Sequence, residues 1–162
     1  MVVQAYQKRT PYTIDHLADM ARRAGRRLQV RLVKGAYWDA EIKRAQIEGY
    51  PGYPVFTRKQ NTDVSYLACA KRLFTHADAI YPMFATHNAH TIAAVRSIAN
   101  GGVYEHQKLH GMGDDLYAEV VPADRLGLPC RVYAPVGSHE DLLPYLVRRL
   151  LENGANSSFV NR

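Results

Sequence analysis

The stretch Leu-Gln-Val-Arg-Leu-Val-Lys-Gly, at residues 28–35, is rich in aliphatic and β-branched side chains and ends at a glycine. A short run of this kind is typical of a β-strand. The preceding residues, 12–26, repeat their apolar side chains with the period of an amphipathic helix. Residues 38–47 are expected to form another helix, so the strand lies between two helices, as in parallel sheets.

The same alternation runs through the whole chain. The predicted strands are Val2–Gln4, Leu28–Lys34, Ala79–Ala85, Gly102–Leu109 and Cys130–Ala134. The predicted helices are Tyr12–Arg26, Trp38–Ile47, Asp63–Phe74, Ala89–Ala99, Asp114–Val121 and Ser138–Asn153. Strict strand–helix alternation predicts an α/β fold with a parallel sheet.

Two α/β architectures fit this order: an open doubly wound sheet and a (β/α)8 barrel. No Gly-x-Gly-x-x-Gly motif follows the first strand, which disfavours a dinucleotide-binding fold. A complete barrel takes about 250 residues. The 162 residues here would therefore make a little over half of a barrel.

Charge and composition narrow the functional classes. The net charge of +6 favours an acidic partner: nucleic acid, an anionic membrane, or a small molecule with phosphate or carboxylate. No apolar run reaches the roughly 18–20 residues that span a bilayer, and no secretory leader is visible. Cys69 and Cys130 lack metal or redox spacing and are expected to be free thiols in a reducing compartment.

The last predicted helix carries the most informative pattern. Its apolar residues, expected to be buried, are Leu142, Leu143, Leu146, Val147, Leu150 and Leu151. Tyr145, Arg148, Arg149 and Glu152 share another face by their spacing. Two neighbouring guanidinium groups suit a carboxylate ligand. The alternative is a solvated face on which Glu152 pairs with one of the arginines.

Three other features have a functional and an ordinary interpretation. Arg31 lies inside an apolar strand, where it either faces a polar cavity or points to solvent from an edge strand. The tripeptide Thr57-Arg58-Lys59 either binds phosphate or is an exposed loop. The spacings His87-x-x-His90 and His106-x-x-x-His110 occur among metal ligands, but no His-Glu-x-x-His motif accompanies them, and no metal site is expected.

Five segments together resemble the proline dehydrogenase family. They are Arg-Leu-Val-Lys-Gly-Ala-Tyr-Trp-Asp (31–39), Phe-Ala-Thr-His-Asn-Ala-His-Thr (84–91), Leu-His-Gly-Met-Gly (109–113), Tyr-Ala-Pro-Val-Gly (133–137) and Tyr-Leu-Val-Arg-Arg-Leu-Leu-Glu-Asn-Gly-Ala-Asn (145–156). The similarity covers nearly the whole chain in the family's order. It is strongest to the proline dehydrogenase domain of bifunctional bacterial flavoproteins.

The resemblance implies a fold and a reaction. Residues 1–162 would be a single partial domain, containing strands four to eight of a distorted (β/α)8 barrel and its closing helix. FAD would accept a hydride from ring C5 of L-proline at flavin N5, giving Δ1-pyrroline-5-carboxylate, and a quinone would reoxidise the flavin. The implied partners are the remainder of the barrel and an aldehyde dehydrogenase domain in a longer parent protein.

Further expectations concern location and assembly. The protein is expected in the cytoplasm, with peripheral association at the inner face of the membrane, and as a homo-oligomer. Nucleic acid is not expected to bind through this region, because the family's DNA-binding members use a separate N-terminal domain. A basic nucleic-acid-binding module, a metal-dependent barrel hydrolase and an inactive fragment are the alternatives.

The resemblance also implies roles for individual residues. The substrate site would comprise Arg31, Ala36, Leu109, Tyr133, Tyr145, Arg148 and Arg149, with the last two holding the carboxylate. The FAD-contacting positions would be Gln4, Arg31, Val33, Gly35, Trp38, Thr57, Arg58, Lys59, Thr86, His87, Gln107 and Glu152. Arg31 would lie beside flavin N5. The basic side chains of His106 and Lys108 depart from the family pattern.

Overall fold

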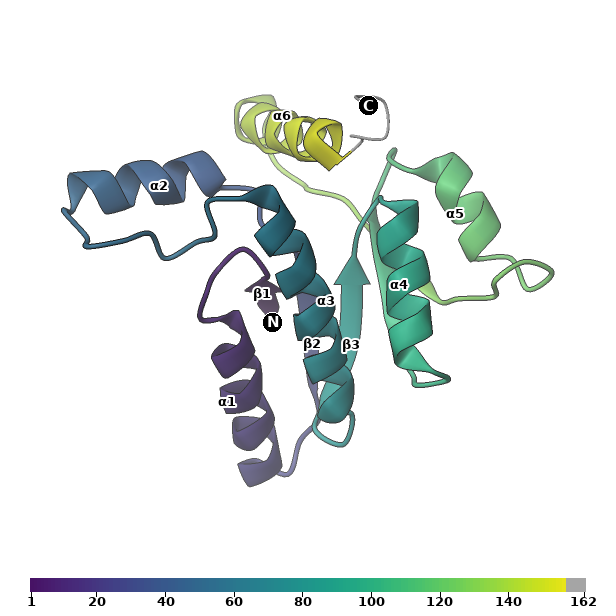
Figure 1. Cartoon of the computed structure of the whole chain (residues 1–162). Helices are drawn as coiled ribbons and strands as arrows, with labels where there is room; N and C mark the ends of the chain where they lie inside the picture. The colour runs from purple at the N-terminus through teal and green to yellow at the C-terminus, as the bar shows by residue number, and fades with distance from the viewer. Residues whose placement is uncertain (157–162) are drawn as a thin grey trace.

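The computed structural model describes residues 1–156, and the side chains of residues 1–150. Its centre is one parallel sheet of five strands in the order β1-β2-β3-β4-β5 (Figure 1). The strands are β1 (Val2–Gln4), β2 (Leu28–Val33), β3 (Ile80–Ala85), β4 (Glu105–Leu109) and β5 (Cys130–Tyr133). The predicted α/β class and parallel sheet are confirmed.

One or two helices connect each strand to the next strand in the sequence. The helices are α1 (Thr10–Arg23), α2 (Trp38–Ile47), α3 (Lys59–Thr75), α4 (Ala89–Ala99), α5 (Asp114–Val120) and α6 (His139–Asn156). In Figure 1, α1, α3 and α4 lie against one face of the sheet, α2 projects away from it, and α6 lies beyond the carboxyl ends of the strands. Because each strand neighbours the next in sequence, the described sheet has no reversal of strand order.

The core lies between the sheet and the helices. Alternate residues of β2, such as Val30 and Leu32, are fully buried there, as are Ile14 of α1, Leu73 of α3 and Val95 of α4. The intervening residues of each strand point to the opposite face, since successive strand side chains alternate. Arg31 belongs to that second face, which the described helices leave uncovered.

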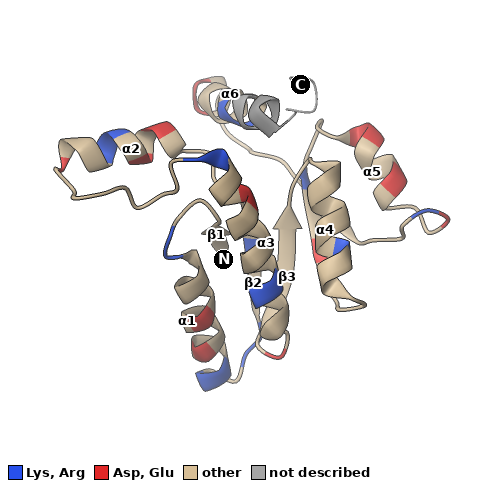
Figure 2. Ribbon diagram, viewed as in Figure 1, with Lys and Arg blue, Asp and Glu red and all other residues tan. Residues whose placement is uncertain are grey.

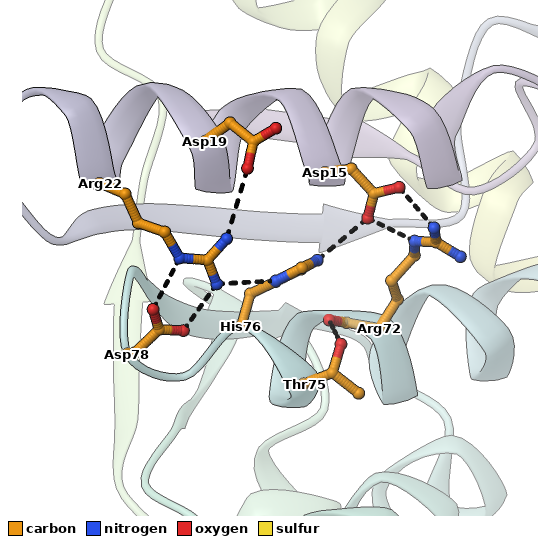
Figure 3. A network of polar contacts seen from close by, with 7 residues as sticks. All are labelled: Asp15, Asp19, Arg22, Arg72, Thr75, His76 and Asp78. Carbon is orange, nitrogen blue, oxygen red and sulfur yellow. Dashed lines mark hydrogen bonds and ion pairs between the residues drawn. The ribbon is translucent and has the colours of Figure 1, made fainter.

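A polar network joins α1 to α3 near the amino ends of the strands. Arg72 makes two hydrogen bonds with the carboxylate of Asp15, and His76 Nε2 lies 3.0 Å from Asp15 Oδ1 (Figure 3). Arg22 binds Asp78 in the same bidentate way, at 2.7 and 2.9 Å. These contacts fix how the two helices pack, far from the carboxyl ends where chemistry is expected.

Several boundaries differ from prediction. Helix α1 ends at Arg23 rather than Arg26, because Gly25 turns the chain with φ of 59°. Helix α3 begins at Lys59 rather than Asp63, so part of the expected loop is helical. The strand predicted over 102–109 begins only at Glu105, because residue 101 lies in a turn and residues 102–104 have no regular secondary structure.

The expected burial of the apolar side of α6 is wrong. Leu143, Leu146, Val147 and Leu150 are 38–62% exposed. The physical reason is that α6 makes no extensive contact with the other described elements. At the start of α6, Ser138 Oγ accepts a hydrogen bond from the backbone N–H of Asp141 at 3.3 Å.

Two surface properties bear on function. Within the described residues, no helix has both the length and the apolar character needed to cross a membrane. Basic residues are interspersed with acidic ones on α1, α2 and α3 (Figure 2). A single basic stripe for nucleic acid is therefore not visible in this view of the chain.

Candidate functional site

Residues from three strands meet on the uncovered face of the sheet. The guanidinium of Arg31 on β2 lies over the ring of Tyr133 on β5, 5.1 Å from its centroid. Its Nη1 atom donates a hydrogen bond of 3.4 Å to Gln107 Oε1 on β4. Strand β2 pairs with both β1 and β3, so the alternative of Arg31 on an edge strand is wrong.

Arg31 also holds an unused donor. Its Nε atom is buried and has no hydrogen-bond partner among the described residues. A buried donor without an acceptor costs about 1–3 kcal/mol. An acceptor atom of a bound molecule at this face would remove that cost, so this arginine is suited to a ligand with hydrogen-bond acceptors.

A cavity of about 690 Å³ lies beyond the end of β2, and residues of the helices α2, α3 and α6 contribute to its lining. Its lining includes four of the predicted flavin contacts, Gly35, Trp38, Thr57 and Lys59, and two predicted substrate contacts, Ala36 and Arg148. The remaining lining residues are Tyr6, Lys34, Tyr37, Asp39, Ala40, Phe56, Thr62 and Asp63. A volume of this size suits a cofactor or small-molecule ligand.

The sequence after β2 gives the cavity its shape. Gly35 has φ of 122°, and a Cβ atom there would lie 2.6 Å from the ring of Tyr6, so only glycine fits. Trp38 Nε1 donates to the carbonyl of Phe56 at 2.9 Å, which ties the start of α2 to the loop before α3. Burial, followed by the charge of Glu41, raises the pKa of Tyr6 to about 12, so its hydroxyl stays neutral.

One wall of the cavity carries an ion-pair cluster. Asp63 on α3 accepts hydrogen bonds from Lys34 at 2.6 Å and from Lys59 at 2.8 Å. Burial alone would raise the pKa of Asp63, but these two ammonium groups outweigh it and leave the pKa below its ordinary value. The cluster has one more positive than negative charge, which favours an anionic group in the cavity.

The two arginines of α6 converge on one ring. The guanidinium of Arg148 lies 4.7 Å from the centroid of Tyr37, and that of Arg149 lies 5.6 Å from it. Arg149 also stacks on Tyr145 at 4.8 Å, as the i, i+4 spacing predicts. Two guanidinium groups at one ring repel each other, and an anion between them would relieve that repulsion.

The carboxyl ends of β3 and β4 are joined by side chains. The hydroxyl of Tyr117 on α5 donates to the carbonyl of Thr86 at 2.8 Å. The Nε2 atom of His87 accepts from the backbone N–H of Leu109 at 3.1 Å, so the proton of the neutral ring is on Nδ1. Thr86, His87 and Leu109, all predicted site residues, are therefore held together.

The remaining predicted positions are only partly brought together. Gln4 and Val33 lie opposite each other in the pairing of β1 with β2, at the carboxyl ends of both strands. Arg58 precedes α3 as an exposed residue and does not line the cavity, unlike its neighbours Thr57 and Lys59. The side chain of Glu152 lies outside the described residues, so its pairing with Arg148 or Arg149 stays a prediction.

Several residues of the site were not predicted, among them Tyr6, Tyr37 and Glu105. Tyr37 lies inside the quoted segment 31–39, and an aromatic residue beside a glycine after a strand was the available signal. Glu105 shares a strand face with Gln107 by the alternation of side chains, which was the available signal, but its contacts depend on neighbouring strands. Within the described part of the chain, no three His, Cys, Asp or Glu residues are placed to hold a metal ion.

Comparisons with known proteins give a consistent result. The family model described as proline dehydrogenase matches residues 1–162. The chain is 66% identical to the bifunctional protein PutA of Klebsiella aerogenes and 64% identical to that of Escherichia coli, in each case over 99% of this chain and 13% of the relative. It is 32% identical to human hydroxyproline dehydrogenase, over 93% of this chain and 34% of that protein.

The fold comparison agrees with the sequence comparison. A solved structure of proline utilization A (PutA) from Bradyrhizobium japonicum is 59% identical and superposes with a TM-score of 0.88. The match covers 98% of this chain and 16% of that one. The chain thus spans about an eighth of the bifunctional relatives it matches. Because the family model matches residues 1–162, this chain belongs to the proline dehydrogenase family.

Proposed function

We propose that this chain contributes the proline-binding and flavin-binding part of an FAD-dependent proline dehydrogenase. The observation that carries the proposal is the convergence of Arg148 and Arg149 on Tyr37 at the rim of the cavity. Two planar cations at one ring are suited to a single carboxylate, which each guanidinium binds in bidentate geometry. L-Proline supplies that carboxylate, and its apolar ring suits the faces of Tyr133 and Tyr145.

The residues present are compatible with FAD. The buried Nε atom of Arg31 needs an acceptor, and a cavity of cofactor size lies beyond the end of the strand that carries Arg31. Thr57 and Lys59 lie at the amino end of α3, where backbone N–H groups and the helix dipole favour phosphate. We place the adenosine diphosphate part of FAD toward Thr57 and Lys59, and its ring system toward Arg31, Gln107 and Thr86.

When bound, FAD supplies the acceptor for a hydride from ring C5 of proline, while the ring nitrogen loses a proton and a C5=N double bond forms. In this scheme Arg148 and Arg149 orient the substrate through its carboxylate. The aromatic rings of Tyr133 and Tyr145 exclude water from the reacting carbon. Arg31 stabilises negative charge that develops on the reduced cofactor.

We further propose that the five strands are strands four to eight of a (β/α)8 barrel, with α6 as the closing helix. The sequential strand order and the helices on one face support this arrangement over a doubly wound sheet. The remainder of the barrel would then cover the open face. A quinone as electron acceptor and an aldehyde dehydrogenase domain in the parent protein complete the proposal.

The test is Arg149→Met in the full-length protein with FAD bound. Removing one partner of a desolvated charge pair costs ~2–4 kcal/mol, so the KM for proline should rise about 30- to 1000-fold. Arg23→Met is the matched control, because Arg23 is exposed on α1 at the other end of the sheet. A KM that stays the same in Arg149→Met would refute the carboxylate site.

A further inference from the structure

A buried carboxylate lies behind Arg31 on the uncovered face of the sheet. Glu105, the first residue of β4, has only 8% of its side chain exposed. Its Oε2 atom accepts a hydrogen bond from Arg131 Nη2 on β5 at 3.1 Å. Its Oε1 atom accepts from Gln107 Nε2 at 2.8 Å. Both carboxylate oxygens are thus bound, one by a cation and one by an amide.

Gln107 connects this carboxylate to Arg31. Its Nε2 atom donates to Glu105 and lies 3.1 Å from Met83 Sδ, while its Oε1 atom accepts from Arg31 Nη1 at 3.4 Å. The reversed amide would place its oxygen against the carboxylate and its NH2 group against the guanidinium, and both contacts would repel. The negative charge of Glu105 therefore permits only one orientation of the Gln107 amide.

The result is a continuous chain of hydrogen bonds: Arg31 donates to Gln107, Gln107 donates to Glu105, and Glu105 also accepts from Arg131. Both contacts of the amide are to ionised groups, and the contact to the carboxylate, at 2.8 Å against 3.4 Å to the guanidinium, is the shorter and stronger of the two. Glu105 and Gln107 are 6% and 5% exposed, which leaves little room for water to replace these contacts. Glu105 is thus linked to the Arg31 guanidinium through Gln107 without touching it.

We infer that Glu105 is a positioning residue for the cofactor: by orienting Gln107, it holds Arg31 where its guanidinium meets the flavin. The inference rests on the proposed function for the location of the flavin. The contacts among Arg131, Glu105, Gln107 and Arg31 are independent of it. Glu105 has no direct role in the chemistry.

The sign of a change in flavin reduction potential separates this role from a simple effect of charge. In Glu105→Gln an anion near the flavin is lost, which by itself would raise the potential. If the residue instead positions Arg31, the cation moves away from the reduced flavin and the potential falls. We expect a fall of about 30 mV or more, which is tenfold in the two-electron equilibrium. A raised or unchanged potential would overturn the inference.

A double-mutant cycle with Arg31→Met tests whether Glu105 acts through Arg31. Arg31→Met alone should lower the potential, and adding Glu105→Gln should produce no further fall. An equal second fall would show that Glu105 acts independently and would contradict the inference. Glu119→Gln is the matched control, because Glu119 also pairs with an arginine, Arg125, at 3.3 Å, but lies on α5. Its potential should equal that of the wild type.

A structural readout needs no flavin. Crystal structures of the full-length protein without cofactor should show the Arg31 guanidinium and the Gln107 amide displaced in Glu105→Gln but not in Glu119→Gln. Unmoved side chains in Glu105→Gln would refute the positioning role. If the wild-type protein does not bind FAD, the proposed function fails, while this comparison still decides whether Glu105 positions Arg31.

Discussion

At the scale of single residues, the site depends on hydrogen bonds that cross from one strand to the next. Tyr117 shows this well, because its hydroxyl reaches the backbone carbonyl of Thr86 at 2.8 Å and that of Gln107 at 3.4 Å. One side chain from α5 thereby ties the carboxyl end of β3 to β4. Both carbonyls belong to positions expected to contact FAD.

We expect Tyr117→Phe to destabilise the protein by about 1–3 kcal/mol, because it leaves buried backbone carbonyls without their donor. FAD binding should weaken as well, since Thr86, a position expected to contact FAD, loses this anchor. The measurement is urea unfolding together with FAD titration of the full-length protein.

Tyr104→Phe provides a matched control for this substitution. The Tyr104 hydroxyl is also buried, but it has no hydrogen-bond partner among the described residues. Its removal should leave both stability and FAD affinity close to those of the wild type. Equal losses in Tyr104→Phe and Tyr117→Phe would mean that the lost hydrogen bonds are not the cause.

At the scale of helices and strands, the pair α1 and α3 is joined by the network of Figure 3. Hydrogen bonds from Arg72 lower the pKa of Asp15 from 3.8 to about 2, and His76 adds to the effect. A carboxyl group with a lowered pKa stabilises the fold above its ordinary pKa. That stabilisation is lost as the pH falls from about 3.8 toward 2.

Asp15→Asn should therefore reduce stability at neutral pH and flatten the loss of stability between pH 4 and 2. A third of the Asp15 side chain is exposed, so screening limits the effect to ~1 kcal/mol. Chemical denaturation measured across this pH range checks the prediction. Asp19→Asn is the control, because the Asp19 side chain is 69% exposed and its contact with Arg22 is long, at 3.4 Å. Stability that depends on pH in the same way in both variants would contradict the prediction.

The sequence predicted the elements better than their ends. The strand at residues 28–33 was predictable, because alternate side chains such as Val30 and Leu32 face the core. The start of α3 at Lys59 was not, since Arg58 is a helix cap with no side-chain hydrogen bond and gives no local signal. Similarly, α6 has the apolar spacing of a buried helix, but its burial depends on neighbours outside its own sequence.

The candidate site was predictable only in part: single residues could be identified from the sequence, but their contacts could not. Arg31, Arg148 and Arg149 stand out because charged side chains interrupt apolar patterns. The contact of Tyr37 with both α6 arginines depends on how the chain folds over a hundred residues of sequence. The same is true of the Glu105–Gln107–Arg31 chain, because it depends on strand register: Met83 lies opposite both Arg31 and Glu105.

At the scale of the whole molecule, the described chain has one covered and one uncovered face of its sheet. The covered face holds the apolar core, and the uncovered face carries Arg31, Glu105, Gln107 and Tyr133. Charged and polar side chains on the uncovered face of a sheet are expected where a cofactor and substrate complete the surroundings. The exposed apolar residues of α6 point to the same need for further chain around the site.

We propose that this site binds FAD and oxidises proline. The most direct measurement is the visible absorption spectrum of the purified full-length protein with FAD, recorded without oxygen before and after proline is added. We predict a bound-flavin spectrum that bleaches with proline, and much weaker bleaching at the same proline concentration in Arg149→Met. A spectrum of free flavin, or bound flavin that proline leaves oxidised, would contradict the claim.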